Sequence, residues 1–127
     1  MSSDKRWSEL AKVLVDHSTA VDKDERVLII MREPDAYPLT MAAYDRIIEK
    51  GGLPQVLFHG AALERSLMLK GTQGQIDWVP ELYGSAMEWA DVCIDLRGAP
   101  NLYEFNGIET ERISAHRRAE GKISAMR

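Results

Sequence analysis

A run of five apolar residues, Val27 to Met31, constrains the fold of this chain more than any other feature. The run follows a charged connector, residues 22–26, and is rich in β-branched side chains. This pattern is typical of a strand that is buried on both faces of a parallel sheet. Two further short strands are predicted at residues 55–59 and 92–96. Because parallel strands need crossover connections, helices are expected between them.

Segments with apolar side chains at helical spacing lie between these strands. Helices are expected at residues 6–18, 38–51, 61–69, 80–90 and 109–121. Gly51 and Gly52 should end the second helix with a left-handed cap, and Gly71 to Gly74 should form a cap and turn. The alternation predicts an α/β fold, a three-layer domain with a small, mostly parallel sheet flanked by helices. Only three strands are found, fewer than the about five or six of an average sheet.

The length of 127 residues and the composition fit a single globular domain. A net charge of −4 gives no basic face of the kind that nucleic-acid binding requires. No apolar run approaches the roughly 18 residues that cross a bilayer. Cys93 has no partner for an intramolecular disulfide, and no signal-peptide core follows the first residues. We therefore expect a cytoplasmic protein without nucleic-acid or membrane partners.

Polar residues follow the predicted strands at the edge where open α/β sheets bind ligands. Arg32, His59, Arg97 and Asn101 each come just after a strand. Cationic groups gathered there would bind a carboxylate or an acidic patch. The sequence thus predicts Arg97, Asn101 and His59 as substrate-binding residues.

Structural pairing is an alternative explanation for the same cations. Arg32 and Arg97 could pair with nearby carboxylates. Asp95, the acid inside the third strand, is expected to pair with an arginine rather than to act as an acid or base.

Motifs for catalysis and metal binding are missing from the sequence. The three histidines, His17, His59 and His116, fall on separate elements, with no i, i+4 histidine pair and no glutamate at motif spacing. We interpret His116 as a contact on a helix face. No Gly-x-Ser-x-Gly elbow is present, and no glycine-rich loop follows the first strand. No catalytic residue, metal ligand or bound cofactor is therefore predicted on this chain.

Several segments together resemble a known family. They are residues 10–14, 22–30, 71–80 and 90–101, with residues 109–120 as a closing helix. In order and spacing they are similar to the amino-terminal domain of the aminopeptidase T/S family, the thermophilic-metalloprotease-type aminopeptidases. The resemblance covers nearly the whole chain.

The resemblance implies a hydrolase that removes amino-terminal residues from peptides with two divalent metal ions, zinc or cobalt. In that family the metal ligands belong to a carboxyl-terminal catalytic domain, and no position here matches them. The chain, as a single α/β domain over residues 1–127, would form one wall of the active-site cavity and be inactive alone. Its partners would be the catalytic domain and a peptide substrate. Because family members are commonly dimers, a homodimer is the assembly to test.

Two other interpretations stay open. The architecture also resembles part of the iron-dependent dihydroxypyridine ring-opening dioxygenases, so the chain could be the equivalent portion of such an enzyme. The third interpretation is a non-catalytic α/β module for binding or assembly. Assays of the complete protein with aminoacyl anilides and with dihydroxypyridines would separate the two enzymes, and sedimentation would test the third interpretation.

Overall fold

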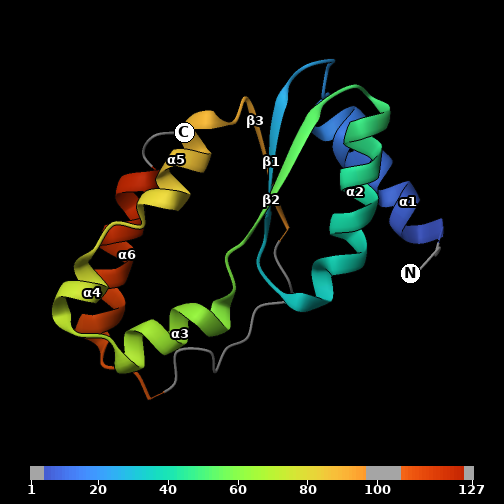
Figure 1. Cartoon of the computed structure of the whole chain (residues 1–127). Coiled ribbons are helices and arrows are strands. Elements are labelled where there is room, and N and C mark those ends of the chain that lie inside the picture. The colour runs from blue at the N-terminus through green and yellow to red at the C-terminus, as the bar shows by residue number, and fades with distance from the viewer. Residues whose placement is uncertain (1–4, 97–106, 125–127) are drawn as a thin grey trace. The chain divides into compact units, whose positions relative to one another are not determined.

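The computed structural model describes residues 5–96 and 107–124, and the side chains of the last helix up to Gly121. It confirms the predicted α/β class, with helices and a small parallel sheet (Figure 1). In chain order the elements are α1 (Lys5–Lys12), the π-helix η1 (Val13–Ser18), β1 (Arg26–Met31), the 3₁₀ turn η2 (Pro34–Ala36), α2 (Tyr37–Glu49), β2 (Leu53–Phe58), α3 (Ala61–Lys70), α4 (Gln73–Asp77), α5 (Glu81–Trp89), β3 (Val92–Leu96) and α6 (Thr110–Ser124). Within the described part of the chain, no helix is both long and apolar enough to cross a bilayer.

The chain divides into two compact units. The sheet unit comprises Met1–Phe58 and Trp89–Gly98, and the helical unit comprises His59–Glu88 and Ala99–Arg127. Each unit is described by itself below.

The sheet unit is built around β1, the strand predicted from the apolar run. β2 and β3 both pair with β1 in parallel, which gives the strand order β2-β1-β3. Residues 27–30 of β1 are at most 1% exposed, as expected for a strand buried on both faces. Helices α1 and α2 pack against the sheet (Figure 1). The core that they form with it consists of Ala11, Val15, Val21, Val27, Ile29, Ala43, Ile47, Ile94 and Leu96.

β2 follows α2 and is an edge strand of the described sheet. Gly51 has a φ of +83°, which confirms the predicted left-handed cap. The N–H of Leu53 then donates to the carbonyl of Glu25 at 2.7 Å, toward β1. Successive backbone N–H groups of a strand point to opposite sides, so an N–H at position 54 would point away from the sheet. Pro54 therefore removes no hydrogen bond from the β1–β2 ladder.

Two half-buried arginine–carboxylate pairs join elements of the sheet unit. Arg32 donates to both oxygens of Asp95 at 2.9 Å, which confirms that Asp95 pairs with an arginine. Arg46 reaches from α2 to Asp16 at 2.6 and 2.9 Å. This hydrogen-bonded pair holds the pKa of the Asp16 carboxyl below its ordinary value. The predicted cation Arg32 is therefore already engaged by a structural partner.

The helical unit contains a helix that the sequence did not predict. Residues 71–74 were expected to form only a cap and turn, but α4 begins there. Its N-cap is Thr72, whose hydroxyl accepts from the N–H of Gln75, while the Gln75 side chain accepts from the N–H of Thr72. This reciprocal capping box satisfies two backbone donors that a helix start leaves free.

Buried apolar side chains come from all four helices of this unit. They are Met68, Ile76, Tyr83, Met87, Ala115 and Ala119. The apolar helical spacing from which α3 and α5 are predicted includes Leu63 and Leu82, yet these two residues are 59% and 75% exposed. Apolar spacing alone therefore did not identify the inner faces of these helices.

Arg112 joins α6 to the carboxyl end of α3. Its Nε donates to the carbonyl of Met68 at 2.5 Å, and its Nη2 donates to the carbonyl of Gly71. The last carbonyls of a helix have no partner within the helix, so a guanidinium is a suitable donor for them. The first turn of α6 is thereby fixed at the end of α3.

Candidate functional site

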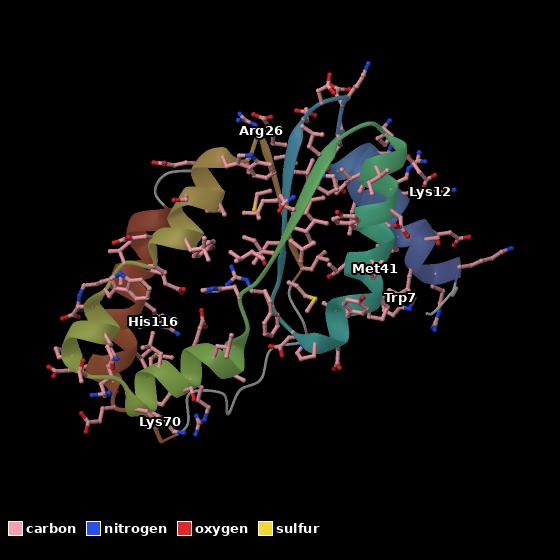
Figure 2. All side chains as sticks on the ribbon, viewed as in Figure 1. Trp7, Lys12, Arg26, Met41, Lys70 and His116 are labelled. Carbon is pink, nitrogen blue, oxygen red and sulfur yellow. The ribbon has the colours of Figure 1, made fainter. Side chains whose placement is uncertain are left out.

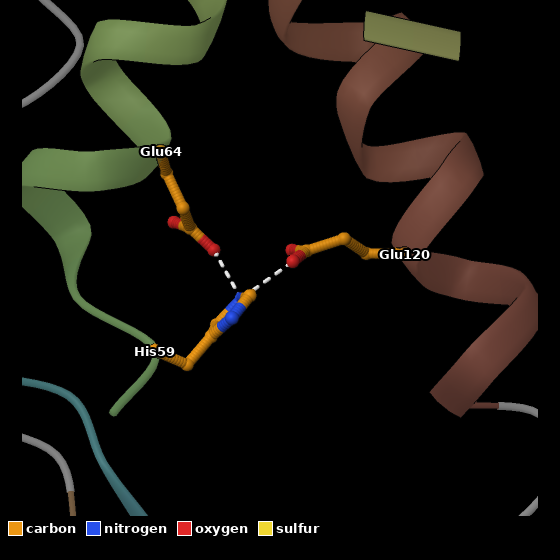
Figure 3. Close-up of side chains that lie close together, drawn as sticks. All are labelled: His59, Glu64 and Glu120. Carbon is orange, nitrogen blue, oxygen red and sulfur yellow. Dashed lines mark ion pairs between the residues drawn. The ribbon is translucent and has the colours of Figure 1, made fainter. Parts of the chain in front are cut away.

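Four polar side chains converge between α3 and α6 within the helical unit. His59 lies just before α3, and Glu64 is in its first turn. His116 and Glu120 lie four residues apart on α6, so they share one face of that helix. Figure 2 shows His116 on α6, and Figure 3 shows His59, Glu64 and Glu120 pointing toward one another. We call these four residues the His–Glu cluster.

The distances within the cluster are short. The Nε2 atom of His59 lies 2.8 Å from Oε1 of Glu64 and 2.5 Å from Oε2 of Glu120 (Figure 3). The Nε2 atom of His116 lies 3.7 Å from Oε1 of Glu64 and 3.5 Å from Oε1 of Glu120. Even so, Nε2 of both histidines and Oε2 of Glu120 are buried without a well-oriented hydrogen-bond partner among the described residues. The groups interact through charge and proximity more than through directed hydrogen bonds.

Burial and charge both shape the ionisation of the cluster. The His116 side chain is only 7% exposed, and the other three side chains are 16–20% exposed. The carboxylates of Glu120 and Glu64 raise the pKa of His59 to about 9. Burial acts to raise the pKa of Glu64, but His116 and His59 hold it well below its usual range. The Glu64 carboxylate also raises the pKa of His116.

An aromatic ring positions His59. The ring of Tyr83, on α5, lies 4.7 Å from the imidazole, centroid to centroid, with the two planes tilted by 34°. Tyr83 is 7% exposed, so its own ring is fixed by packing. This contact limits rotation of the imidazole and keeps Nε2 close to the carboxylates.

The donor chemistry of the cluster fits a divalent cation. One ligand atom from each of His59, Glu64 and Glu120 lies within 4.8 Å of the others. Imidazole nitrogen and carboxylate oxygen are the ligands that zinc and similar ions take in proteins. The same groups can also form an ion-pair network when the histidines are protonated.

Of the three predicted substrate-binding residues, the structure describes only His59. Arg97 and Asn101 lie outside the described residues, so their role stays a prediction. His59 is described, and its side chain is held by two carboxylates and a tyrosine ring. Whether it also contacts substrate stays a prediction.

Sequence reasoning missed both glutamates of the cluster. It considered spacing between histidines, whereas the informative spacings are His59 to Glu64 and His116 to Glu120. The second of these places a histidine and a glutamate on one helix face. Glu120 comes 56 positions after Glu64 in the sequence, so no local pattern connects the pair His59–Glu64 with the pair His116–Glu120.

Comparisons with known proteins give a family match and a similarity to solved structures. The family model described as thermophilic metalloprotease (M29) matches residues 3–126. Among solved structures, wild-type AmpT from Thermus thermophilus is similar, with a TM-score of 0.77 and 14% sequence identity. The similarity covers 95% of this chain and 31% of that one, so this chain spans about a third of the length of AmpT. At such low identity it shows a shared fold. A search of curated proteins found no match.

Proposed function

The chain belongs to the thermophilic metalloprotease (M29) family, and from this membership we propose that it is the amino-terminal portion of a metal-dependent aminopeptidase. The observation that carries the proposal is the family match, which extends over residues 3–126. The similarity to only 31% of the AmpT chain supports a role as one part of a longer enzyme. No observation favours the alternative of a ring-opening dioxygenase.

The proposed reaction is hydrolysis of amino-terminal residues from peptides. Divalent ions, zinc or cobalt, held by residues outside this chain would polarise the scissile carbonyl and lower the pKa of an attacking water. The proposed contribution of this chain is one wall of the active-site cavity, which would position the peptide and exclude bulk water. The chain would then be inactive alone.

Within that wall, we assign the substrate-facing role to the residues that follow β3. Arg97 and Asn101 can offer a guanidinium and an amide to peptide carbonyls or a carboxylate. His59 is engaged by Glu64 and Glu120, so its imidazole would have to leave these carboxylates to contact a substrate. A carboxyl-terminal catalytic domain, a homodimeric assembly and a cytoplasmic location complete the proposal.

The test compares two proteins. The chain of residues 1–127 and the product of any longer reading frame that contains it are assayed with aminoacyl anilides in the presence of zinc or cobalt. We expect turnover only from the longer protein, with loss of activity on chelation and recovery when the ion is restored. Turnover by residues 1–127 would overturn the proposal that this portion is inactive. A longer protein without peptidase activity, or one that opens dihydroxypyridine rings with iron, would overturn the function itself.

A single substitution then tests whether Arg97 contacts the substrate from the proposed cavity wall. In the longer protein, Arg97→Gln is expected to raise KM by roughly 10-fold or more with little change in kcat, because it removes charge-assisted hydrogen bonds to the ground state and transition state alike. Arg118→Gln, at an exposed position on α6, is the matched control and should leave both constants unchanged. Equal effects of the two substitutions would argue against a substrate-facing Arg97.

A further inference from the structure

We propose that the His–Glu cluster binds one divalent metal ion of the zinc class, with His59, Glu64 and Glu120 as ligands and His116 as the fourth. The ion would be structural, would lie inside the helical unit, and would be separate from any catalytic ions of the proposed enzyme. The inference goes beyond the proposed function and does not rest on it.

A proton satisfies this cluster poorly. Two carboxylate oxygens lie 2.8 and 2.5 Å from Nε2 of His59. A ring nitrogen carries a single N–H direction, so it can serve only one oxygen at a time. In addition, Nε2 of His59, Nε2 of His116 and Oε2 of Glu120 have no well-oriented partner among the described residues. A cation can accept the lone pairs of all these atoms at once, whereas a proton cannot.

The size of the cluster also suits a small ion. Zinc binds nitrogen and oxygen at about 2.0–2.1 Å, so the corners of its tetrahedron lie about 3.3–3.4 Å apart. The distances of 3.5 and 3.7 Å from His116 to the two carboxylates are close to that edge. Those from His59 are shorter, and lengthening them to a tetrahedral edge needs shifts of roughly 1 Å or less. Ordinary side-chain adjustment is sufficient for movements of this size.

The charge balance favours a divalent ion. Glu64 and Glu120 place two carboxylates in an environment where their side chains are 17% and 20% exposed. Buried charges are stable when they are paired or coordinate a metal. One divalent cation with two carboxylates and two neutral imidazoles gives a net charge of zero. His116 is only 7% exposed, and its Nε2 lies 3.5 and 3.7 Å from oxygens of the two glutamates, so it can complete a set of four protein ligands.

Four protein ligands define a closed site, which is the arrangement of structural rather than catalytic zinc. Two of the ligands lie at the start of α3 and two lie on α6. Arg112 already joins α6 to the opposite end of α3 through Met68 and Gly71. α3 and α6 form an antiparallel pair. Arg112 joins them at the carboxyl end of α3, and the ion would join them at its amino end.

The test uses the chain of residues 1–127, stripped of metal by a chelator and titrated with Zn²⁺ or Co²⁺ in a calorimeter. We expect one equivalent to bind, visible absorption bands of tetrahedral Co²⁺, and a higher unfolding temperature in the presence of either ion. Mg²⁺ should bind far more weakly, because it prefers a shell of oxygen ligands. Wild-type protein without stoichiometric binding of Zn²⁺ and Co²⁺ overturns the proposal.

Variants identify the ligands. His59→Gln, Glu64→Gln and Glu120→Gln should each weaken binding by more than ~100-fold, beyond the 10–100-fold effect of losing an outer-shell partner. His17→Gln and Glu88→Gln change the same residue types at exposed positions and should bind as the wild type does. Binding that survives all three cluster substitutions would place the ion elsewhere and overturn the proposal.

A measurement on the wild type guards against variants that do not fold. X-ray absorption of the zinc-loaded chain should show a shell of nitrogen and oxygen at about 2.0–2.1 Å with the outer scattering of two imidazoles. A spectrum without imidazole scattering would overturn the proposal regardless of how the variants behave.

Discussion

The two units of this chain use opposite means to hold their helices. In the sheet unit, α1 and α2 pack on a core made only of apolar side chains, and arginine–carboxylate pairs such as Arg46–Asp16 are half-buried outside that core. In the helical unit, α3 and α6 meet around four buried or half-buried polar side chains, with Arg112 on the carbonyls at the other end of α3. The sheet unit shows how a local apolar pattern specifies packing. The helical unit depends on polar partners that are distant in sequence.

The largest effect should come from the apolar core of the sheet unit. Ile29 is completely buried in β1, and Ile29→Ala should lower the free energy of unfolding by ~2–5 kcal/mol through lost transfer energy and a cavity. Ile48→Ala, at a position 53% exposed on α2, is the matched control and should cost much less. Urea unfolding followed by far-ultraviolet circular dichroism measures both. Similar losses at the two positions would contradict an apolar core centred on β1.

The next prediction tests close packing in the helical unit. A Cβ added at Gly71 would lie 2.5 Å from the carbonyl oxygen of Leu67, so Gly71→Ala should cost ~1–3 kcal/mol through a steric clash with the backbone. At Gly74, inside α4, the nearest atom to an added Cβ is 3.9 Å away, and Gly74→Ala should stabilise by up to ~1 kcal/mol through helix propensity. Thermal unfolding of the two variants should shift in opposite directions. Shifts of the same sign would show that the end of α3 is loosely packed.

Replacing Arg112 tests how much its hydrogen bonds to the carboxyl end of α3 stabilise the helical unit. Arg112→Met keeps much of the apolar stem but removes the donors to Met68 and Gly71, and should cost ~1–2 kcal/mol. Arg118→Met, exposed on the same helix, should change stability by less than ~0.5 kcal/mol. Hydrogen exchange of the last amides of α3 should rise in the Arg112 variant only. Unchanged protection there would mean that α3 needs no partner at its carboxyl end.

The smallest effect is expected from pH on metal-free protein, because desolvation offsets much of the attraction between buried charges. His59 has a folded-state pKa of about 9 against an ordinary 6.5, so its stabilisation is complete below about pH 6.5 and is lost as the pH rises through about 9. Glu64, with a lowered pKa, contributes stability above about pH 4.5 and loses it as the pH falls further. Unfolding temperatures in chelator should therefore be highest between these limits. In Glu120→Gln the folded-state pKa of His59 should be lower, so the alkaline loss of stability should be smaller and should be complete at a lower pH. A profile identical to the wild type would contradict the assignment.

The sheet unit was predicted well from the sequence because its strands and its helix cap are determined by residues close together in the chain. Residues 27–31 and 92–96 were predicted as strands from their apolar runs, and Gly51 as a left-handed cap from its place after a helix. Each of these features is determined by neighbours within a few residues, and each is confirmed. The pairing of Asp95 with an arginine also followed, because an acid inside a strand needs a partner.

The helical unit was predicted less well because apolar spacing marks its inner faces only in part. Leu63 and Leu82 are exposed, whereas His116 is buried beside Ala115 and Ala119. A buried histidine can be recognised only together with the carboxylates that accompany it, and Glu64 lies 52 residues earlier in the chain. The His–Glu cluster thus required the fold itself before its members could be brought together.

The proline at the edge of the sheet has a consequence for how these chains behave when crowded. Among the described residues β2 is an edge strand of the sheet, and its Leu53, Val56 and Phe58 are 42–50% exposed. Such an exposed edge invites the strand of another chain to add to it, which is the first step of aggregation. Because Pro54 occupies a position whose N–H would point outward, it interrupts the row of donors that an incoming strand would use. Pro54 removes no hydrogen bond between β1 and β2, and it thereby protects the protein against non-native self-assembly.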